Sequence, residues 1–285
     1  MGVKESRILL SGRRTLAGMQ VSAISLRQKL ICCSAVVLAG CGILLAQAPA
    51  DRALPFSPGE TLKYDVTWSI FPAGQVIATL KQLGQGPQDA YEIESSAESS
   101  GFVSVLFGIN NHYRSIFDPN TLCSREIYKT INEGRRHKQT HIVFDSERKV
   151  AILNEVDLSK PNHPVKHATD TIPGCVEDIL TSFYYLRRQP MYVGEKIRLP
   201  VNDGSATHEV IVDVQERGRL QTPMGVRYAF RVEPRALGDL YKKKGRMLIW
   251  FSDDRQRLPL RIKAMLRVGA ITGNLVSVSN SPPRP

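Results

Sequence analysis

The stretch LKYDVTWSIFPAGQVIATL, residues 62–80, has the pattern of a β-hairpin. Apolar and polar side chains alternate from Leu62 to Trp68, which is the period of a strand with one buried face. Turn-forming residues follow at 71–74 (FPAG), and the extended pattern resumes over 75–80. Residues 62–80 therefore predict two antiparallel strands joined by a turn.

Similar short runs continue along the chain on both sides of a single break. They cover residues 91–99, 112–117, 124–132, 137–145, 150–154, 196–201, 208–216, 227–233, 245–252, 258–266 and 271–278. Closely spaced strands with little helix between them are typical of an antiparallel meander. We therefore expect a mainly β fold, in which the meander forms a strongly curved sheet or a half-barrel or barrel-like body.

The break lies at residues 175–188, where the apolar residues change to helical spacing. Val176, Ile179, Phe183 and Leu186 would share one face, which predicts an amphipathic helix that covers the sheet. A second apolar stretch, GFVSVLFGI at 101–109, has two interpretations. It fits a buried strand or short helix, and it also fits an apolar flap over a ligand cavity.

The composition is that of a globular protein, and its basic charge is concentrated at the N-terminus. The 285 residues are 42% hydrophobic and 23% charged, with a formal net charge of +11. Residues 1–50 hold six Lys or Arg against one acid, so the remainder carries only +6. A mild excess spread over strands favours a solvated face over a phosphate-binding patch, and no nucleic-acid partner is expected.

Residues 1–49 have the parts of a secretory signal. A basic segment ending at Lys29 is followed by an apolar run over 30–46 and by small residues near Ala48. The basic segment is long when counted from Met1, and Met19 would be a more typical start, so residues 1–18 are candidates for an untranslated extension. The prediction is a single β-rich domain over 50–278, followed by a disordered tail over 279–285.

The same run allows two other kinds of processing. Leu38-Ala39-Gly40-Cys41 matches a lipobox, in which Cys41 would be lipidated, and an uncleaved signal would remain as an anchor. All three alternatives place the rest of the chain outside the cytoplasm. The expected location is the periplasm or another exported site, with membrane attachment under the second and third alternatives.

Two cysteines, Cys123 and Cys175, remain in the expected exported body. In an oxidising compartment such a pair is a candidate disulfide, and closing a loop of about 50 residues would stabilise the fold by roughly 4 kcal/mol. The alternative is two buried free thiols.

The stretch IWFSDDRQRLPLRI, residues 249–262, could hold a catalytic acid pair or a hairpin. The residues around Trp250 and Leu260 are strand-like, and an Asp in the Asp253-Asp254 pair can accept hydrogen bonds from the backbone two residues on. Arg257 and Pro259 fit the start of a strand at a sheet edge. The hairpin is favoured, with a structural role for Asp254.

Several motifs in order resemble the bacterial domain-of-unknown-function family 3108. They are Gly59-Glu60-x-Leu62-x-Tyr64 with Ala73-Gly74, Asp178-Ile179-Leu180-Thr181-Ser182-x-Tyr184-Tyr185-Leu186-Arg187, Gly194-Glu195-Lys196, Thr222-Pro223-x-Gly225, and Trp250-x-Ser252-Asp253-Asp254-x-x-Arg257-x-Pro259-Leu260. The resemblance covers about residues 54–278. It implies a secreted or envelope-attached protein rich in antiparallel strands, and it transfers no catalytic residues.

The residues themselves predict no catalytic, cofactor or metal site. The chain has no Gly-x-Ser-x-Gly, no His-Glu-x-x-His and no phosphate-binding glycine loop. His137 and His141 have the i, i+4 spacing of zinc ligands, but in a strand their Cα atoms would be about 13 Å apart. His163 and His167 have the same spacing in a segment that reads as a loop. A non-enzymatic protein is favoured over an unrecognised hydrolase, which would need a cleft with acids such as Asp178 or Asp254.

Two non-enzymatic functions remain from the sequence. The first is binding of a lipid or another apolar or amphipathic envelope molecule, because a curved sheet around one helix offers an apolar pocket. The second is a structural or interaction module in an envelope complex. The basic run Lys242, Lys243, Lys244 and Arg246 reads as an exposed loop, either for solubility or for contact with an anionic surface. The oligomeric state is not predicted.

Overall fold

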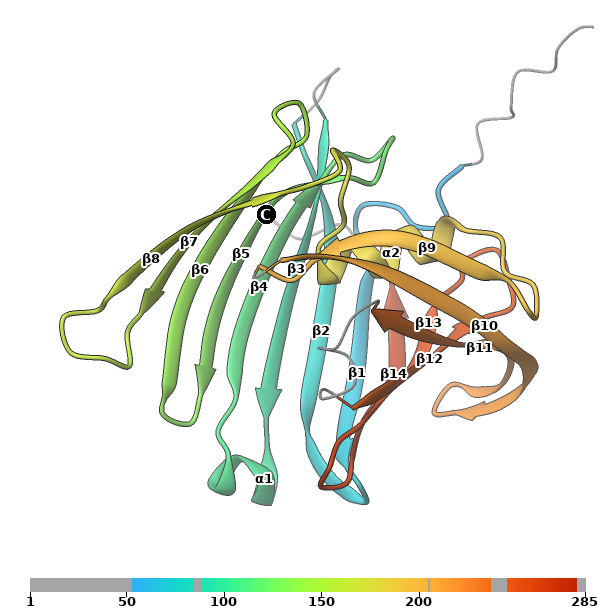
Figure 1. Ribbon diagram of the computed structural model, residues 1–285. Helices are drawn as coiled ribbons and strands as arrows, with labels where there is room; N and C mark the ends of the chain where they lie inside the picture. Colours follow the sequence, from blue (N-terminus) through green and yellow to red (C-terminus); the bar gives the residue numbers. More distant parts are fainter. Residues whose placement is uncertain (1–52, 85–88, 205, 237–244, 281–285) are drawn as a thin grey trace, which may run out of the picture. The chain divides into compact units, whose positions relative to one another are not determined.

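The computed structural model describes residues 53–84, 89–204, 206–236 and 245–280, which belong to one unit of the chain, Ala53–Pro285. These residues form a single antiparallel sheet of fourteen strands that does not close into a barrel. The spatial order is β8-β7-β6-β5-β4-β3-β2-β1-β14-β13-β12-β11-β10-β9 (Figure 1). The predicted mainly β meander is therefore confirmed, and the two expected strand series form one sheet because β1 pairs with β14.

The first series has the bounds β1 (Thr61–Trp68), β2 (Phe71–Leu83), β3 (Ala90–Ser99), β4 (Asn110–Phe117), β5 (Ser124–Glu133), β6 (Arg136–Asp145), β7 (Val150–Asp157) and β8 (Val165–Thr171). The second series has the bounds β9 (Lys196–Asn202), β10 (Thr207–Thr222), β11 (Gly225–Ala236), β12 (Arg246–Ser252), β13 (Pro259–Met265) and β14 (Ala270–Ser279). Two helices are described, α1 (Gly101–Leu106) and α2 (Ile179–Arg188).

The β1–β2 hairpin forms as predicted, but its turn lies earlier than the residues 71–74 that we expected. Strand β2 already begins at Phe71, and Ser69 adopts the left-handed conformation at φ 55° that reverses the chain. Gly74 lies inside β2 opposite Ser99 of β3, and a Cβ there would come within 2.0 Å of the Glu98 carbonyl oxygen. The glycine that suggested a turn is thus required by the close approach of a neighbouring strand.

Strand β8 was missed because its sequence, VKHATDT, has no apolar alternation. It is an edge strand, and five of its seven residues are exposed, so no buried face marks it in the sequence. His167, which we placed in a loop, lies in this strand and bonds Asn154 of β7.

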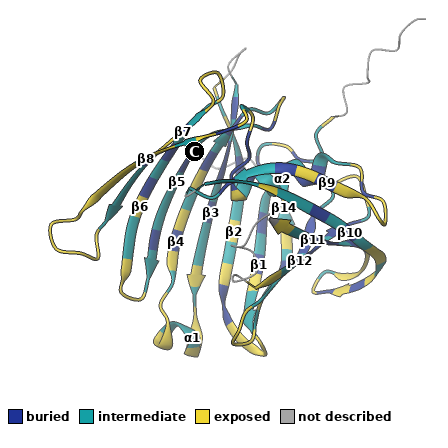
Figure 2. Cartoon of the chain, viewed as in Figure 1, coloured by how far each residue is buried: buried dark blue, intermediate teal, exposed yellow. Residues whose placement is uncertain are grey.

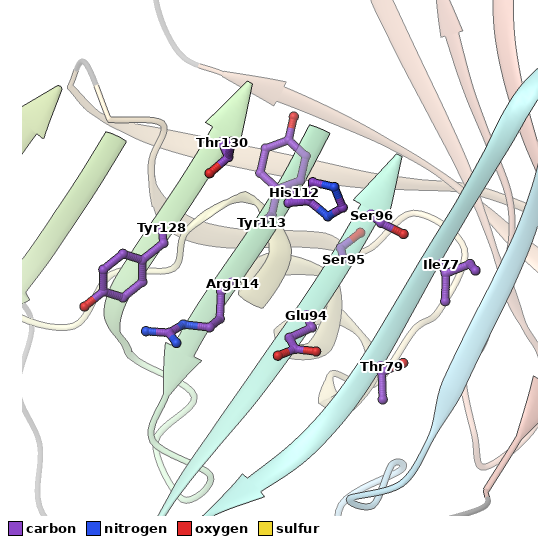
Figure 3. A pocket seen from close by; sticks show the side chains of 10 residues that line it. All are labelled: Ile77, Thr79, Glu94, Ser95, Ser96, His112, Tyr113, Arg114, Tyr128 and Thr130. Carbon is purple, nitrogen blue, oxygen red and sulfur yellow. The ribbon is translucent and has the colours of Figure 1, made fainter. Parts of the chain in front are cut away.

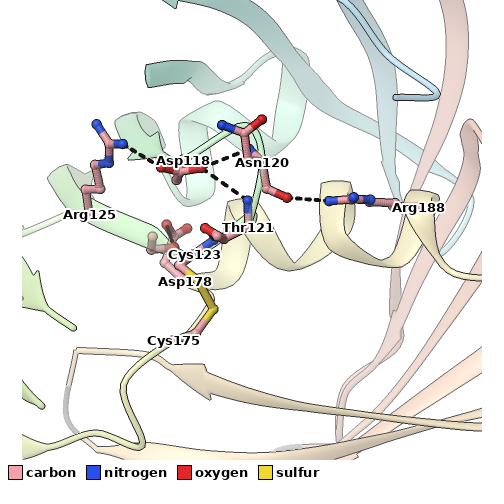
Figure 4. The surroundings of a disulfide bond; sticks show 9 residues. Asp118, Asn120, Thr121, Cys123, Arg125, Cys175, Asp178 and Arg188 are labelled. Carbon is pink, nitrogen blue, oxygen red and sulfur yellow. Dashed lines mark hydrogen bonds and ion pairs between the residues drawn. A yellow bond between two sulfur atoms is a disulfide. The ribbon is translucent and has the colours of Figure 1, made fainter. Parts of the chain in front are cut away.

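Helix α2 is shorter at its N-terminus than the predicted range 175–188. The Asp178 carboxylate accepts hydrogen bonds from the backbone N–H groups of Leu180 and Thr181, which makes Asp178 the N-cap. Cys175 precedes this cap and is disulfide-bonded to Cys123, with the two Cα atoms 5.1 Å apart (Figure 4).

The sheet curves around α2, which packs against both halves. Leu186 of α2 joins an apolar core with β9 to β12, while Tyr184 joins another with Leu80 of β2 and Phe117 of β4. Figure 2 shows buried positions on strands of both halves of the sheet. At one corner the end strand β8 contacts the opposite end of the sheet through Asp170, whose carboxylate accepts bonds from the N–H and hydroxyl of Thr207 in β10, at 2.8 and 2.9 Å, and from the side-chain amide of Asn202 in β9, at 3.3 Å.

The stretch at 101–109 contains the short helix α1, and the interpretation that this segment is buried is wrong. None of the residues of α1 is buried, and Phe102, Val105 and Leu106 are exposed. The helix follows β3 and lies beside the start of β2, where Ser100 donates its N–H to the Ala73 carbonyl. The helix lies at the end of the sheet, which fits the alternative interpretation of this segment as an apolar flap (Figure 1).

Several predicted features lie outside the described residues. They are the signal region 1–49 with Cys41, the run Lys242 to Lys244, and the tail from residue 281. None of the helices in the described residues is long and apolar enough to cross a membrane.

Candidate ligand-binding site

Small side chains gather on the inner face of the sheet, the face toward α2, where strands β13, β14, β1, β2 and β3 neighbour each other. The register pairs Val76 of β2 with Tyr64 of β1 and with Ala97 of β3, and it pairs Ala264 of β13 with Ile271 of β14. Larger residues on this face would interdigitate as in a packed core. Alanine and glycine instead leave space above the strands.

That space consists of two adjoining apolar pockets. One has a volume of about 590 Å³ and is bounded by α1 and by the β13–β14 turn. The other has a volume of about 250 Å³ and lies against α2. Val66, Val76 and Ile271 line both pockets. Together they have the size and the apolar walls of small-molecule sites.

A buried hydroxyl without a partner stands in the wall of the pocket beside α2. The ring of Tyr184 is almost fully buried, and its hydroxyl has no hydrogen-bond partner among the described residues. Burial, and then the nearby Glu60 carboxylate, raise the pKa of Tyr184, so this hydroxyl stays a neutral donor. The neighbouring Tyr64 differs, because its hydroxyl donates to the Pro259 carbonyl at 2.9 Å. An orphaned polar group in an apolar wall can hydrogen-bond a ligand oxygen.

A charged groove lies on the other side of α2, over β5, β6 and β7. Its volume is about 410 Å³, and Leu180 of α2 borders both this groove and the smaller apolar pocket. Lys129 donates to the Asp203 carbonyl at 2.8 Å, and burial lowers the pKa of its ammonium group. Lys138 pairs with Glu155, and Lys166 also borders the groove. Glu133, Glu155 and Asp203 also line the groove, so an amphipathic molecule would meet apolar walls and walls of mixed charge within this one concave face.

The outer face of β2 to β5 carries a polar depression of about 600 Å³ (Figure 3). Arg114 lies over the ring of Tyr128 at 4.4 Å, and that ring stacks on His141 at 4.1 Å. Glu126 accepts hydrogen bonds from Tyr128 and pairs with His141. These four side chains therefore interact with one another at the surface. The depression itself is open and is lined mainly by polar residues.

Two acids are buried at the start of α2, Glu177 and Asp178. Asp178 accepts bonds from the hydroxyls of Ser115, Ser124 and Thr181 besides capping the helix. Glu177 is buried with one oxygen unpaired among the described residues, and burial, with the nearby Asp178 charge, raises its pKa to about 8. Neither residue lines one of the two apolar pockets.

The histidines with metal-like spacing lie apart. His137 contacts Asn132, and His141 contacts Glu126. Within the residues that the structure describes, no three His, Cys, Asp or Glu side chains are grouped to hold a metal ion.

The stretch at 249–262 contains the β12–β13 hairpin. Asp254 accepts bonds from the backbone N–H of Gln256 and Arg257 and from the Ser252 hydroxyl, while Asp253 pairs with Arg217 and Arg257. Pro259 starts β13, but this strand lies between β12 and β14, so the expectation of a sheet edge is wrong. A register shift between Trp250 and Phe251 accommodates the proline.

Arg246, the described member of the predicted basic run, binds Glu233. Its guanidinium makes two hydrogen bonds to that carboxylate, at 2.8 and 2.7 Å. These bonds to Arg246, with further ones from Gln215 and Arg235, hold the pKa of Glu233 at about 2.

The residues that shape the pockets were not identified from the sequence. Ala97 and Ala264 carry no chemical signal of their own, and Tyr184 reads as one more aromatic on a helix. The one signal available is the recurrence of small residues at alternate strand positions, such as Ala97 and Ser99 on β3.

The open, curved sheet with an inner apolar pocket defines the chain as a β-barrel-like protein. The chain belongs to the family described as "Protein of unknown function (DUF3108)", whose model matches residues 63–276. This confirms the resemblance seen in the sequence.

The solved structures that match this chain are distant in sequence. A β-barrel-like protein of domain of unknown function DUF1849 from Brucella abortus is 10% identical, with a TM-score of 0.53 over 77% of this chain and 96% of that chain. A candidate exported protein with a YmcC-like fold from Bacteroides fragilis NCTC 9343 is 8% identical, with a TM-score of 0.35 over 79% and 98% of the two chains. No curated protein matches this chain. Neither the family description nor the description of the DUF1849 structure names a catalytic activity.

Proposed function

We propose that this protein is a non-enzymatic, exported envelope protein that binds an apolar or amphipathic envelope molecule on the inner face of its sheet. The observation that carries the proposal is the pair of adjoining apolar pockets, of about 590 and 250 Å³, between the sheet and its two helices. Apolar side chains without packing partners in a folded core usually mark a binding site or an interface.

Export is supported by the signal-like residues 1–49 and by the disulfide between Cys123 and Cys175. Disulfides of this kind persist in oxidising compartments such as the periplasm. The periplasm is the compartment we propose, with Cys41 lipidation and an uncleaved signal as the alternatives for attachment.

The polar groups at the pocket define the ligand class more closely. The Tyr184 hydroxyl offers one neutral donor, and the groove beyond Leu180 offers the ammonium groups of Lys129 and Lys166. An acyl chain that ends in an ester, carboxylate or phosphate group carries oxygens that can accept hydrogen bonds from the hydroxyl and from the ammonium groups. A lipid or lipid precursor of the envelope is therefore the proposed ligand.

The test fills the pockets without changing the surface. Ala97→Phe and Ala264→Phe each add a ring to a partly exposed alanine that lines the larger or the smaller pocket. The matched control is Ala168→Phe, which alters a partly buried alanine of β8 away from both pockets. Native mass spectrometry and organic extraction of protein recovered from its own envelope measure bound lipid.

We expect copurified lipid with the wild type and the control, and loss of that lipid with both pocket-filling variants. The absence of extractable lipid from the wild type, together with no rise in Tm on adding envelope lipids, contradicts the proposal. Equal lipid in all variants would place the ligand elsewhere.

A further inference from the structure

Exposed apolar side chains are concentrated at one end of the sheet, around the larger pocket. The segments at 69–71, 102–107 and 266–268 carry eight of the eighteen large apolar side chains that are exposed among the described residues. We name these eight the apolar rim: Ile70, Phe71, Phe102, Val105, Leu106, Phe107, Leu266 and Val268. Ile70 and Val105 are 83% exposed and Val268 is 71% exposed, so the rim does not fold back into the protein.

The three segments adjoin one another although they are far apart in the sequence. Trp68, before the β1–β2 turn, donates its indole N–H to the Val268 carbonyl in the β13–β14 turn at 3.1 Å. Helix α1 is held to the start of β2 by the bond from Ser100 to Ala73. Figure 1 shows α1 and both turns at the same end of the sheet.

The rim continues into the larger apolar pocket. Leu106, Phe107, Leu266 and Val268 belong to the rim and also line that pocket. An apolar ligand that enters or leaves by this end would pass between rim side chains. Because such a ligand has very low solubility in water, direct contact with a lipid phase would remove the aqueous step.

Basic residues flank the rim. Arg267 is exposed between Leu266 and Val268, and Arg135 is exposed in the β5–β6 turn, where Gly134 donates its N–H to the carbonyl of Gly108, just after α1. Neither arginine has an ion-pair partner in the part of the chain that the structure describes. The opposing charges are Glu98, at the border of the pocket, and Glu133, which pairs with Arg136 at the β5–β6 turn. Apolar tips flanked by arginines suit a bilayer with anionic headgroups.

We infer that the apolar rim is a membrane-docking surface, which inserts its side chains into the headgroup region of an anionic bilayer and opens the larger pocket toward the lipid. The occupant we commit to is the bilayer surface. This inference extends the proposed function but depends on different residues, so the two can fail separately.

The first experiment is flotation of the full-length chain with vesicles. Phosphatidylethanolamine and phosphatidylglycerol vesicles are compared with phosphatidylcholine vesicles. The rim variant carries Ile70→Ser, Phe102→Ser, Val105→Ser and Val268→Ser. The matched control carries Ile152→Ser, Tyr192→Ser, Val193→Ser and Val226→Ser, four exposed apolar residues outside the rim. Melting of each variant checks its fold.

The rim variant is expected to lose binding to the anionic vesicles by about tenfold or more, and the control to keep it, because membrane affinity scales with the apolar area inserted. Arg135→Gln with Arg267→Gln is expected to reduce the preference for anionic over phosphatidylcholine vesicles. Equal flotation of the wild type, the rim variant and the control would overturn the inference.

A second readout separates the rim from the apolar N-terminal segment of the full-length chain. In a chain with Trp68→Phe and Trp250→Phe, the tryptophan of Val105→Trp is expected to be quenched by brominated lipids, while that of Val193→Trp is not. Absence of quenching at residue 105 overturns the inference even where the chain floats. Loss of self-association in the rim variant, with unchanged vesicle binding, would assign the rim to a second copy of the chain instead.

Lipid extraction keeps the two proposals apart. Ala97→Phe is expected to empty the larger pocket and to leave vesicle binding intact, whereas the rim variant is expected to lose vesicle binding first. Vesicle binding by a wild type that carries no lipid would contradict the proposed function alone.

Discussion

Glu60 and Arg187 are 127 residues apart in the sequence and form a fully buried ion pair. Two hydrogen bonds join them, at 2.5 Å from Nη1 to Oε1 and at 2.7 Å from Nη2 to Oε2. Arg187 also donates to the carbonyls of Pro55 and Gln256, so the guanidinium ties α2 to the segment before β1 and to the β12–β13 turn. The pair closes the α2 end of the smaller apolar pocket, which Arg187 lines.

Removal of either partner is expected to be costly, because the other charge is left buried without compensation. Glu60→Gln or Arg187→Met should lower the free energy of unfolding by about 3–5 kcal/mol, and Glu60→Leu with Arg187→Met should recover a large part of that loss. Urea denaturation measures both. Glu209→Gln, which breaks the exposed pair with Arg198, is the control and should cost less than about 1 kcal/mol. Wild-type stability in either single variant would contradict the prediction.

Loss of the disulfide is expected to destabilise the fold through the unfolded chain. The bond joins residues 52 apart, for which the chain-entropy model predicts about 4 kcal/mol. It also holds Cys175 near the Asp178 cap of α2 (Figure 4). Cys123→Ser with Cys175→Ser should therefore reduce the urea midpoint, and alkylation followed by mass measurement should show two protected thiols in the wild type. Free thiols at both positions in protein from the envelope would contradict this.

Stability is expected to fall as the pH rises, because of Glu177. Its folded pKa of about 8 exceeds the ordinary value of 4.5, so the folded state binds this proton more tightly than the unfolded state does. The contribution is fully present below pH 4.5 and is lost as the pH rises through about 8. The loss is on the order of 3 kcal/mol between about pH 5 and pH 9. Glu177→Gln should remove this part of the pH dependence in urea denaturation, and parallel profiles for the two proteins would refute the assignment.

Asp254→Ala is expected to lower stability more than it lowers any binding activity. The carboxylate holds two backbone N–H groups and the Ser252 hydroxyl in the β12–β13 turn, where Arg257 adopts a positive φ of 47°. Its loss should cost about 1–2 kcal/mol. Asp254→Asn keeps a side-chain acceptor, so it should cost about half as much stability as Asp254→Ala. Wild-type melting of the alanine variant would show that the turn needs no carboxylate.

Tyr184→Phe separates ligand binding from folding. The Tyr184 hydroxyl has no partner in the described part of the ligand-free chain, so its removal should leave stability unchanged or raise it by up to about 1 kcal/mol. A ligand oxygen that accepts from this hydroxyl should instead bind about tenfold less tightly to the variant. Thermal melting with and without added lipid measures both effects. A lower Tm for the lipid-free variant would assign the hydroxyl a structural bond.

The sequence predicted the strands best where a buried face alternates with a polar one. Residues 62–68 follow this pattern, and they form β1. The sequence prediction failed for β8, whose polar residues lie at a sheet edge. It also misplaced the turn after Trp68, because Gly74 is needed for the close approach of β3 and does not reverse the chain. Local composition cannot separate these cases, because the deciding contact comes from a residue distant in sequence.

The sequence by itself determined the mainly β meander, the helix α2, the family, and the two cysteines available for a bridge, because these depend on periodicity and residue type. Only the tertiary structure decided that Cys123 and Cys175 are bonded, that Glu60 meets Arg187, and that α1 borders a pocket. The physical reason is that a cavity is made where neighbouring strands place small side chains opposite one another, as at Ala97 and Val76. Such a juxtaposition depends on strand register across the sheet, which no single stretch of sequence contains.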